Sequence, residues 1–111
     1  AQPPIPGAVW FGSHELWTVL NADGSYLPAK SVWWSVRFPG GAIEERPALS
    51  VSWGRIDGEQ LSVESEGRAT NANSADSGDF MIATIDPPDP GCWQVTATYK
   101  GARLSYVVKV P

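Results

Sequence analysis

Hydrophobic and polar residues alternate along most of this chain of 111 residues. The alternation is regular in five stretches, which are 30–38, 48–53, 60–66, 92–99 and 103–110. Side chains of a β-strand point in turn to opposite faces of a sheet, so each stretch predicts a strand with one buried and one solvated face. The segments 15–20 and 80–85 also predict strands, although their patterns leave the buried face undecided. Together they make about seven short strands.

Turn-forming residues separate these strands, and no segment longer than a turn or two has helical periodicity. The residues Lys100–Ala102 predict a tight hairpin between the last two strands. The stretch 66–79, rich in Asn, Ser, Asp and Gly, predicts the longest loop. This pattern predicts an all-β fold, a two-sheet antiparallel β-sandwich. We expect a single domain over 8–111, preceded by an extended arm or linker over 1–7.

The segment PGCWQV, residues 90–95, resembles the start of strand F in bacterial immunoglobulin-like and fibronectin type III-like domains. In this resemblance Trp93 takes the place of the corner aromatic residue. Trp34, on the inward side of the strand over 30–38, takes the place of the core tryptophan of strand C. The resemblance implies that the expected β-sandwich is immunoglobulin-like.

Three longer segments carry a narrower resemblance: FGSHELWTVL, KSVWW and PGCWQVTATYKGARLSYVVKV. They are similar to short, uncharacterised, secreted or lipid-anchored bacterial proteins that share a G-x-x-x-LW segment and a C-terminal PGCW-x-(V/I)-T segment. The resemblance implies an extracytoplasmic setting, which is periplasmic, secreted or lipid-anchored at the cell surface. The start AQPPIPGA, which lacks Met, reads as a mature terminus or a trimmed chain. The resemblance implies no activity and no catalytic residues.

Cys92 is the only cysteine, so no disulfide forms within the chain. In the immunoglobulin pattern the corner aromatic and the strand-F cysteine lie two residues apart on one inward face. With the aromatic at Trp93, that position is Val95, and Cys92 points to the opposite face. Two interpretations stay open. Cys92 is either a small apolar residue packed under the preceding DPPDP turn, or an exposed thiol that pairs with another chain or a ligand.

Six tryptophans are many for a chain of this length. The alternation assigns Trp34, Trp53 and Trp93 to the core, and it turns Trp33 outward beside Arg37. An outward tryptophan on a flat sheet stacks on a sugar ring or anchors a protein partner. The candidate binding residues are Trp33, Arg37, Trp10 and Trp17, the last two without a defined face.

Other candidate chemistry is sparse. His14 is the only histidine, and the chain has no G-x-S-x-G nucleophile motif. A copper site needs two histidines besides a cysteine, so His14, Cys92 and Met81 do not make one. Loop carboxylates are weak calcium candidates, for which turn formation is the alternative role. These carboxylates are Asp76, Asp79, Asp86 and Asp89. We therefore expect no enzyme activity, no metal and no cofactor.

Charge and hydropathy narrow the choice of partner. The net charge is −4 without a basic stripe, which argues against nucleic-acid binding. No apolar run approaches the roughly 20 residues that a transmembrane helix needs. We expect a non-catalytic extracytoplasmic binding or structural module that acts through protein–protein contacts, self-association included. The alternative is a carbohydrate-binding module that uses outward-facing tryptophans.

Overall fold

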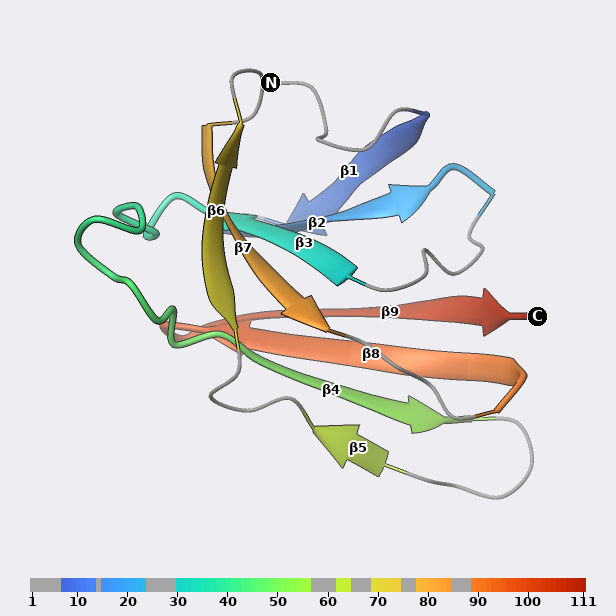
Figure 1. The fold of residues 1–111 in the computed structure, drawn as a ribbon. Coiled ribbons are helices and arrows are strands. Elements are labelled where there is room, and N and C mark those ends of the chain that lie inside the picture. The colour runs from blue at the N-terminus through green and yellow to red at the C-terminus, as the bar shows by residue number, and fades with distance from the viewer. Residues whose placement is uncertain are drawn as a thin grey trace.

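The computed structural model describes residues 7–13, 15–23, 30–56, 62–64, 69–74, 78–84 and 89–111. The described residues form nine β-strands in two antiparallel sheets (Figure 1). The strands are β1 (Ala8–Ser13), β2 (Leu16–Asn21), β3 (Lys30–Ser35), β4 (Ser50–Arg55), β5 (Ser62–Glu64), β6 (Thr70–Ser74), β7 (Gly78–Thr84), β8 (Gly91–Tyr99) and β9 (Ala102–Val110). None of these residues belongs to a helix that could cross a membrane. The predicted all-β antiparallel sandwich is confirmed.

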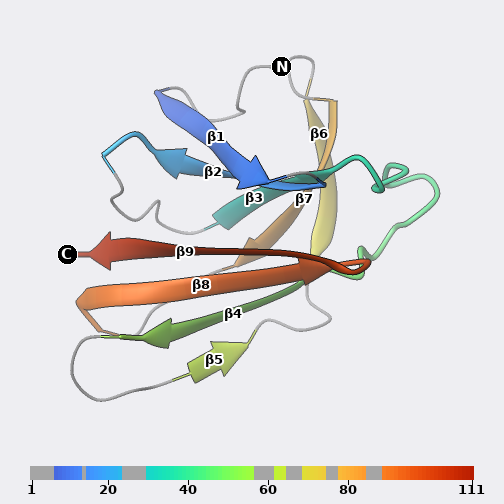
Figure 2. The same cartoon turned by 180° about the vertical axis from the view of Figure 1, so that it is seen from behind.

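Five strands make sheet A, in the order β1-β2-β3-β7-β6, and four make sheet B, in the order β5-β4-β8-β9. The two sheets pack face to face, as Figures 1 and 2 show from opposite sides. If β1 is set aside, sheet A has the order A-B-E-D and sheet B the order C′-C-F-G of immunoglobulin-type sandwiches. Strand β1 is therefore an addition to the edge of sheet A.

The hairpin of β8 and β9 is the longest ladder among the described strands. Its two strands are paired from Tyr99 and Ala102 at the turn to Gly91 and Val110 at the far end. The two turn residues have positive φ angles, 46° at Lys100 and 87° at Gly101. Two consecutive positive φ angles define the type I′ turn, whose twist matches that of the strands. The predicted tight hairpin over Lys100–Ala102 is confirmed.

The main core lies between the sheets, where the inward residues of sheet B follow the predicted alternation. These residues are Leu49, Val51, Trp53, Trp93, Val95, Ala97, Tyr99, Leu104, Tyr106 and Val108, all at most 9% exposed. Sheet A contributes Leu16, Trp33, Met81 and Ala83 to the same cluster. Burial of this apolar surface is the main favourable term in the stability of the sandwich.

The predicted phase of the strand over 30–38 is wrong. Trp33 is fully buried between the sheets, whereas Trp34 is half-buried on the opposite face. The serines that the alternation assigned to a solvated face lie on the same side as Trp33, where Ser35 is buried and Ser31 is half-buried. The Trp33 indole Nε1 donates to Ser31 Oγ over 2.7 Å, and Ser31 Oγ donates to the Ala83 carbonyl over 2.6 Å. Because these hydroxyls are paired, burying them costs little, and the polar residues of β3 face the core.

Two related expectations also need correction. Trp34 does not take the core position that the resemblance implied, because it is half-buried on β3 of sheet A, whereas the buried tryptophans of sheet B are Trp53 and Trp93. The predicted loop over 66–79 contains β6 and the start of β7. Its Asn and Ser residues suit an edge strand, because among the described strands β6 has a neighbour on one side only, and its backbone pairs with that neighbour, β7. The strand count rises from about seven to nine because of β1 and β6.

Candidate functional site

The outer face of sheet A, which points away from sheet B, carries three half-buried tryptophans. Trp17 on β2 lies directly opposite Trp34 on β3, and Trp10 on β1 lies opposite Val19 on β2. Directly opposite residues of an antiparallel pair have adjacent side chains on one face. Sheet register thus brings together the two predicted candidates Trp10 and Trp17. It adds Trp34, which the sequence had assigned to the core.

Gly12 explains how Trp17 fits on this face. It lies opposite Trp17 across the β1–β2 ladder. A Cβ atom placed on Gly12 would lie 2.6 Å from the Trp17 ring and 2.5 Å from the Leu16 carbonyl oxygen, which is closer than atoms approach. The indole therefore lies over Gly12, where only a glycine leaves room for it.

Beside these tryptophans the outer face of sheet A has a second apolar cluster. Val19, Val32 and Phe80 are at most 6% exposed, and Ala8, Trp10, Ala72 and Ile82 pack against them. Sheet A is therefore apolar on both faces, unlike a sheet with one solvated face. The cluster also anchors β1, because Ala8 and Trp10 both belong to it.

Trp33, the outward tryptophan of the prediction, does not take part in this face. Its ring centroid lies 6.0 Å from that of Tyr106 on β9, inside the main core. With no exposed surface, Trp33 is a packing residue rather than a contact residue. The exposed aromatic residue nearby is Phe11 on β1, whose ring meets Tyr106 edge to face at 6.1 Å.

The inward face of β1 leaves two large apolar side chains exposed. Val9 and Phe11 point toward the layer of sheet B, yet they are 45% and 40% exposed. The cause is the unequal width of the sheets. Across the layers β2 is the strand that lies close to β9, the edge of sheet B, so β1 extends one strand beyond that edge. Figure 2 shows this side of the molecule, with β1 above β9. We call Val9, Phe11 and the outer edge of β9 the apolar step.

Arg37, the fourth predicted binding residue, has structural partners. Its Nε lies 3.0 Å from Glu15 Oε2, and its Nη1 donates to the Lys100 carbonyl over 2.9 Å. Lys100 Nζ in turn donates to the Arg37 carbonyl over 3.2 Å. Arg37 thus joins the turn after β3 to the β8–β9 hairpin.

Glu44 holds the β3–β4 loop on the same hairpin. Its Oε1 accepts a hydrogen bond from the Tyr99 hydroxyl and lies 3.1 Å from Lys100 Nζ, and its Oε2 accepts from the Ala48 amide over 2.9 Å. Partial burial alone would raise the pKa of Glu44, but the bonds from Tyr99, Ala48 and Lys100 outweigh it and lower that pKa. Burial and then the bond to Glu44 raise the pKa of Tyr99. Hydrogen bonds to Tyr99 and Glu44 raise the pKa of Lys100. This cluster stabilises the β3–β4 loop on the β8–β9 hairpin.

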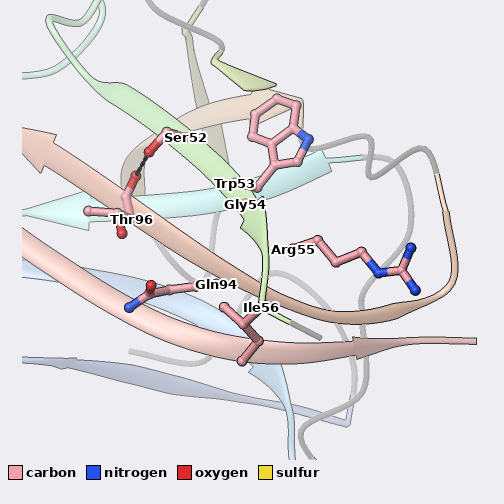
Figure 3. A pocket seen from close by; sticks show the side chains of 7 residues that line it. All are labelled: Ser52, Trp53, Gly54, Arg55, Ile56, Gln94 and Thr96. Carbon is pink, nitrogen blue, oxygen red and sulfur yellow. Dashed lines mark hydrogen bonds between the residues drawn. The ribbon is translucent and has the colours of Figure 1, made fainter. Parts of the chain in front are cut away.

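The outer face of sheet B has a shallow pocket of about 200 Å³ around Gly54 (Figure 3). The other lining residues are Ser52, Trp53, Arg55, Ile56, Gln94 and Thr96. In Figure 3 the Gln94 amide and the Arg55 guanidinium point in opposite directions. Ser52 Oγ reaches the Thr96 carbonyl at 3.5 Å, which is a weak hydrogen bond. The polar groups do not converge on one point, so this pocket is not a built site.

Cys92 lies on β8 opposite Lys109 of β9 and is half-buried. The buried neighbours Trp93 and Val95 confirm that Cys92 faces away from the core. Its backbone carbonyl accepts from the Ile56 amide over 3.0 Å. The residues 86–88 of the DPPDP turn lie outside the described part, so packing under that turn stays a prediction.

Of the remaining candidates, His14, Asp76 and Asp86 lie outside the described residues. Asp79 is exposed on β7 and Asp89 precedes β8. The Asp89 carbonyl accepts from Trp93 Nε1 over 2.9 Å. The described residues contain no group of three His, Cys, Asp or Glu side chains that could hold a metal ion.

Comparison with known proteins gives no relative: no family model, no curated protein and no solved structure matches the chain. Sequence reasoning missed Val9, Phe11 and Trp34 as surface residues. The sequence did contain a signal for Val9 and Phe11, because Val9, Trp10 and Phe11 are three consecutive apolar residues in one strand. A run of this kind has apolar side chains on both faces, so one of the two faces is a contact surface or a second core.

Proposed function

We propose that this protein is a non-catalytic binding module that recognises a protein partner through the apolar step. The observation that carries this proposal is the exposure of Val9 and Phe11, 45% and 40%, on the face of β1 that points toward the sheet B layer. Inward positions of a sandwich are normally covered. Apolar side chains left open beside an unpaired strand edge are typical of a protein contact surface.

The step is a preformed surface, which favours binding. The outer side of β1 is fixed by Ala8 and Trp10 in the second apolar cluster. The ring of Phe11 rests edge to face on Tyr106, a residue of the main core. A contact surface held from both sides loses little conformational entropy on binding, so more of the contact energy appears as affinity.

The proposed setting is extracytoplasmic, in a bacterium. It rests on the resemblance of the N-terminal LW segment and the C-terminal PGCW segment to secreted and lipid-anchored bacterial proteins. The single cysteine is compatible with that setting, because the sandwich is stabilised by its two apolar clusters and needs no disulfide.

A carbohydrate-binding module is the second candidate function. The observation that favours it is the direct pairing of Trp17 with Trp34 on the outer face of sheet A, with Trp10 on the same face. Indole rings gathered on one face of a sheet provide stacking surfaces for sugar rings. These tryptophans are only half-buried, so each keeps some contact area.

Site-specific photo-crosslinking in the producing cell tests the protein-binding function. We expect a photoreactive amino acid at Val9 to give a discrete protein adduct, and Phe11→Glu in the same chain to abolish it. The matched control is Ile43, which is apolar and 78% exposed but lies in the β3–β4 loop rather than on β1 or β9. Equal adducts from both positions would show non-specific contact and would contradict the proposal.

A glycan array decides the second candidate. Binding of a defined glycan that is lost in Trp17→Ala and Trp34→Ala but kept in Phe11→Glu would establish the tryptophan face as the site. Thermal melts of each variant verify that the sandwich is folded.

A further inference from the structure

The free edge of β9 lies directly beside the exposed side chains of β1. Strand β9 runs over nine residues from Ala102 to Val110, and among the described strands it pairs only with β8. An unpaired edge of this length presents backbone donors and acceptors that can pair with an additional strand.

The hairpin geometry identifies which amides of β9 point outward. In a two-residue hairpin the residues that flank the turn, Tyr99 and Ala102, exchange hydrogen bonds with each other. Paired and unpaired positions then alternate along an antiparallel ladder, so every second residue from Ala102 bonds to β8. The backbone groups that point away from β8 belong to Arg103, Ser105, Val107 and Lys109.

A strand added at this edge would lie beneath β1. Strand β2 lies closest to β9 across the layers, and β1 is the next strand of sheet A outward from β2. A fifth strand of sheet B would take the corresponding place below β1. Its inward side chains would cover Val9 and Phe11, so these positions must be apolar.

The outward side chains of the added strand are also constrained. Arg103 and Lys109 are exposed on the outer face of β9. Opposite charges on adjacent strands stabilise a cross-strand pair, and like charges oppose it. Acidic side chains on the outward positions of the partner therefore match this edge.

A second copy of the chain does not fit the same place. Joining β9 to β9 of another copy would make the two sheets B continuous. The β2 strand of that copy would then lie over its own β9, in the space into which β1 of the first copy extends. The step accommodates a single extended segment rather than a whole sandwich.

We propose that the partner segment is an extended chain, with apolar residues alternating with acidic ones, that adds to β9 as a fifth strand of sheet B beneath β1. This inference rests on the proposed function, in which the step binds protein. It further specifies how the partner binds: backbone hydrogen bonds to β9 supply much of the affinity, and the contacts of Val9 and Phe11 select the register.

The first test uses a capped synthetic peptide as long as β9, with valine at odd positions and glutamate at even positions. We expect saturable binding by NMR titration and slower hydrogen exchange at the amides of Arg103, Ser105, Val107 and Lys109. The control peptide, with lysine in place of glutamate, is expected to bind about tenfold more weakly. The inference is overturned by absence of saturable binding, by binding that leaves these four amides unprotected, or by equal affinity of both peptides.

Proline at an outward amide gives the sharper variant. Val107→Pro removes a donor that does not bond to β8, so we expect the sandwich to stay folded and peptide affinity to fall about tenfold. Val107→Thr keeps the amide and is the matched control, with affinity expected within about twofold. A thermal melt verifies that both variants are folded, and Ser105→Pro is the second variant at another outward amide.

The two proposals fail in different ways. If Phe11→Glu abolishes the in-cell adduct but Val107→Pro and Ser105→Pro leave it unchanged, the step binds protein without strand addition, and only this inference is overturned. If none of the three substitutions changes the adduct at Val9, the proposed function is itself overturned. Loss of the adduct in all three, together with an intact adduct in Val107→Thr, supports both.

Discussion

At the scale of single residues, the two most informative side chains are Trp33 and Trp53. Both are nearly inaccessible to solvent, at 0% and 4% exposure. The indole nitrogen of Trp33 donates to Ser31, whereas that of Trp53 is the one buried side-chain polar atom among the described residues without a hydrogen-bond partner. A buried donor without a partner destabilises the folded state.

The same substitution at both positions should therefore have different effects. Trp33→Phe and Trp53→Phe remove the same atoms and leave cavities of similar size, but Trp53→Phe also removes the unpaired donor. We expect Trp33→Phe to lower the free energy of unfolding by about 1–3 kcal/mol more than Trp53→Phe. Urea denaturation of both variants measures the difference. Equal losses would mean that Trp53 Nε1 has a partner in solution.

Glu44 should make the stability depend on acid pH. Its pKa in the folded protein is lowered from 4.5, so its ionised form stabilises the fold above that value, and this stabilisation is lost as pH falls through the lower folded pKa. We expect the urea midpoint of the wild type to fall on acidification more steeply than that of Glu44→Gln. Glutamine has nearly the same shape as glutamate, but it does not titrate. If the urea midpoints of the wild type and of Glu44→Gln fall in parallel as the pH is lowered, Glu44 is not the cause of the pH dependence.

Residue-level reasoning from the sequence succeeded where one face of a strand is solvated. Cys92 was correctly placed on the face opposite Trp93 and Val95. It failed at Trp33 because Ser31 and Ser35 count as solvated residues in a pattern, yet both face the core with their hydroxyls hydrogen-bonded, Ser35 buried and Ser31 half-buried. The alternation of hydrophobic and polar residues does not show which hydroxyl groups have hydrogen-bond partners on strands distant in the sequence.

At the scale of elements, the hairpin of β8 and β9 depends on one glycine. Gly101 has φ 87° and no atom near the position of a Cβ, so a side chain would cause backbone strain without a clash. We expect Gly101→Ala to lower the free energy of unfolding by about 1–2 kcal/mol. Gly101→Asn should be less harmful because Asn tolerates positive φ. Thermal denaturation compares the two, and an unchanged melting temperature for Gly101→Ala would contradict the type I′ assignment.

Elements of sheet B could be predicted well and those of sheet A less well, for a physical reason. The strands over 48–53, 92–99 and 103–110 have one polar face, and their buried residues alternate as expected. Strands β2 and β3 bury apolar residues on both sides, so their phase could not be read from alternation. The candidate site could not be predicted for a related reason. The exposure of Val9 and Phe11 depends on the number of strands in sheet B, which the pattern of a single strand does not show.

At the scale of the whole molecule, the unequal width of the two sheets determines how copies of the chain can meet. Edge pairing through β9 would place β2 of a second copy in the space into which β1 extends. The step is thus open to a single strand and closed to a second sandwich, and β1 protects this edge against self-association.

We accordingly expect a monomer in sedimentation equilibrium at neutral pH over a wide range of concentration. The net charge of −4 adds a weak repulsion between copies. Adding the valine–glutamate peptide should leave the mass at one chain plus one peptide. A dimer that dissociates on adding the peptide would show instead that a second copy occupies the step.

The apolar character of both faces of sheet A has a consequence for the folding pathway. A strand that slips by one residue normally exposes its hydrophobic side chains. In β3 the slip would put Trp34 in the core in place of Trp33 and Trp33 on the outer face, so each side would keep a tryptophan. Its correct register is distinguished by hydroxyl groups: Thr18 donates to the Val32 carbonyl over 2.8 Å, and Ser31 donates to that of Ala83. These two hydrogen bonds therefore select between competing compact states, and without them a misregistered intermediate should accumulate during refolding.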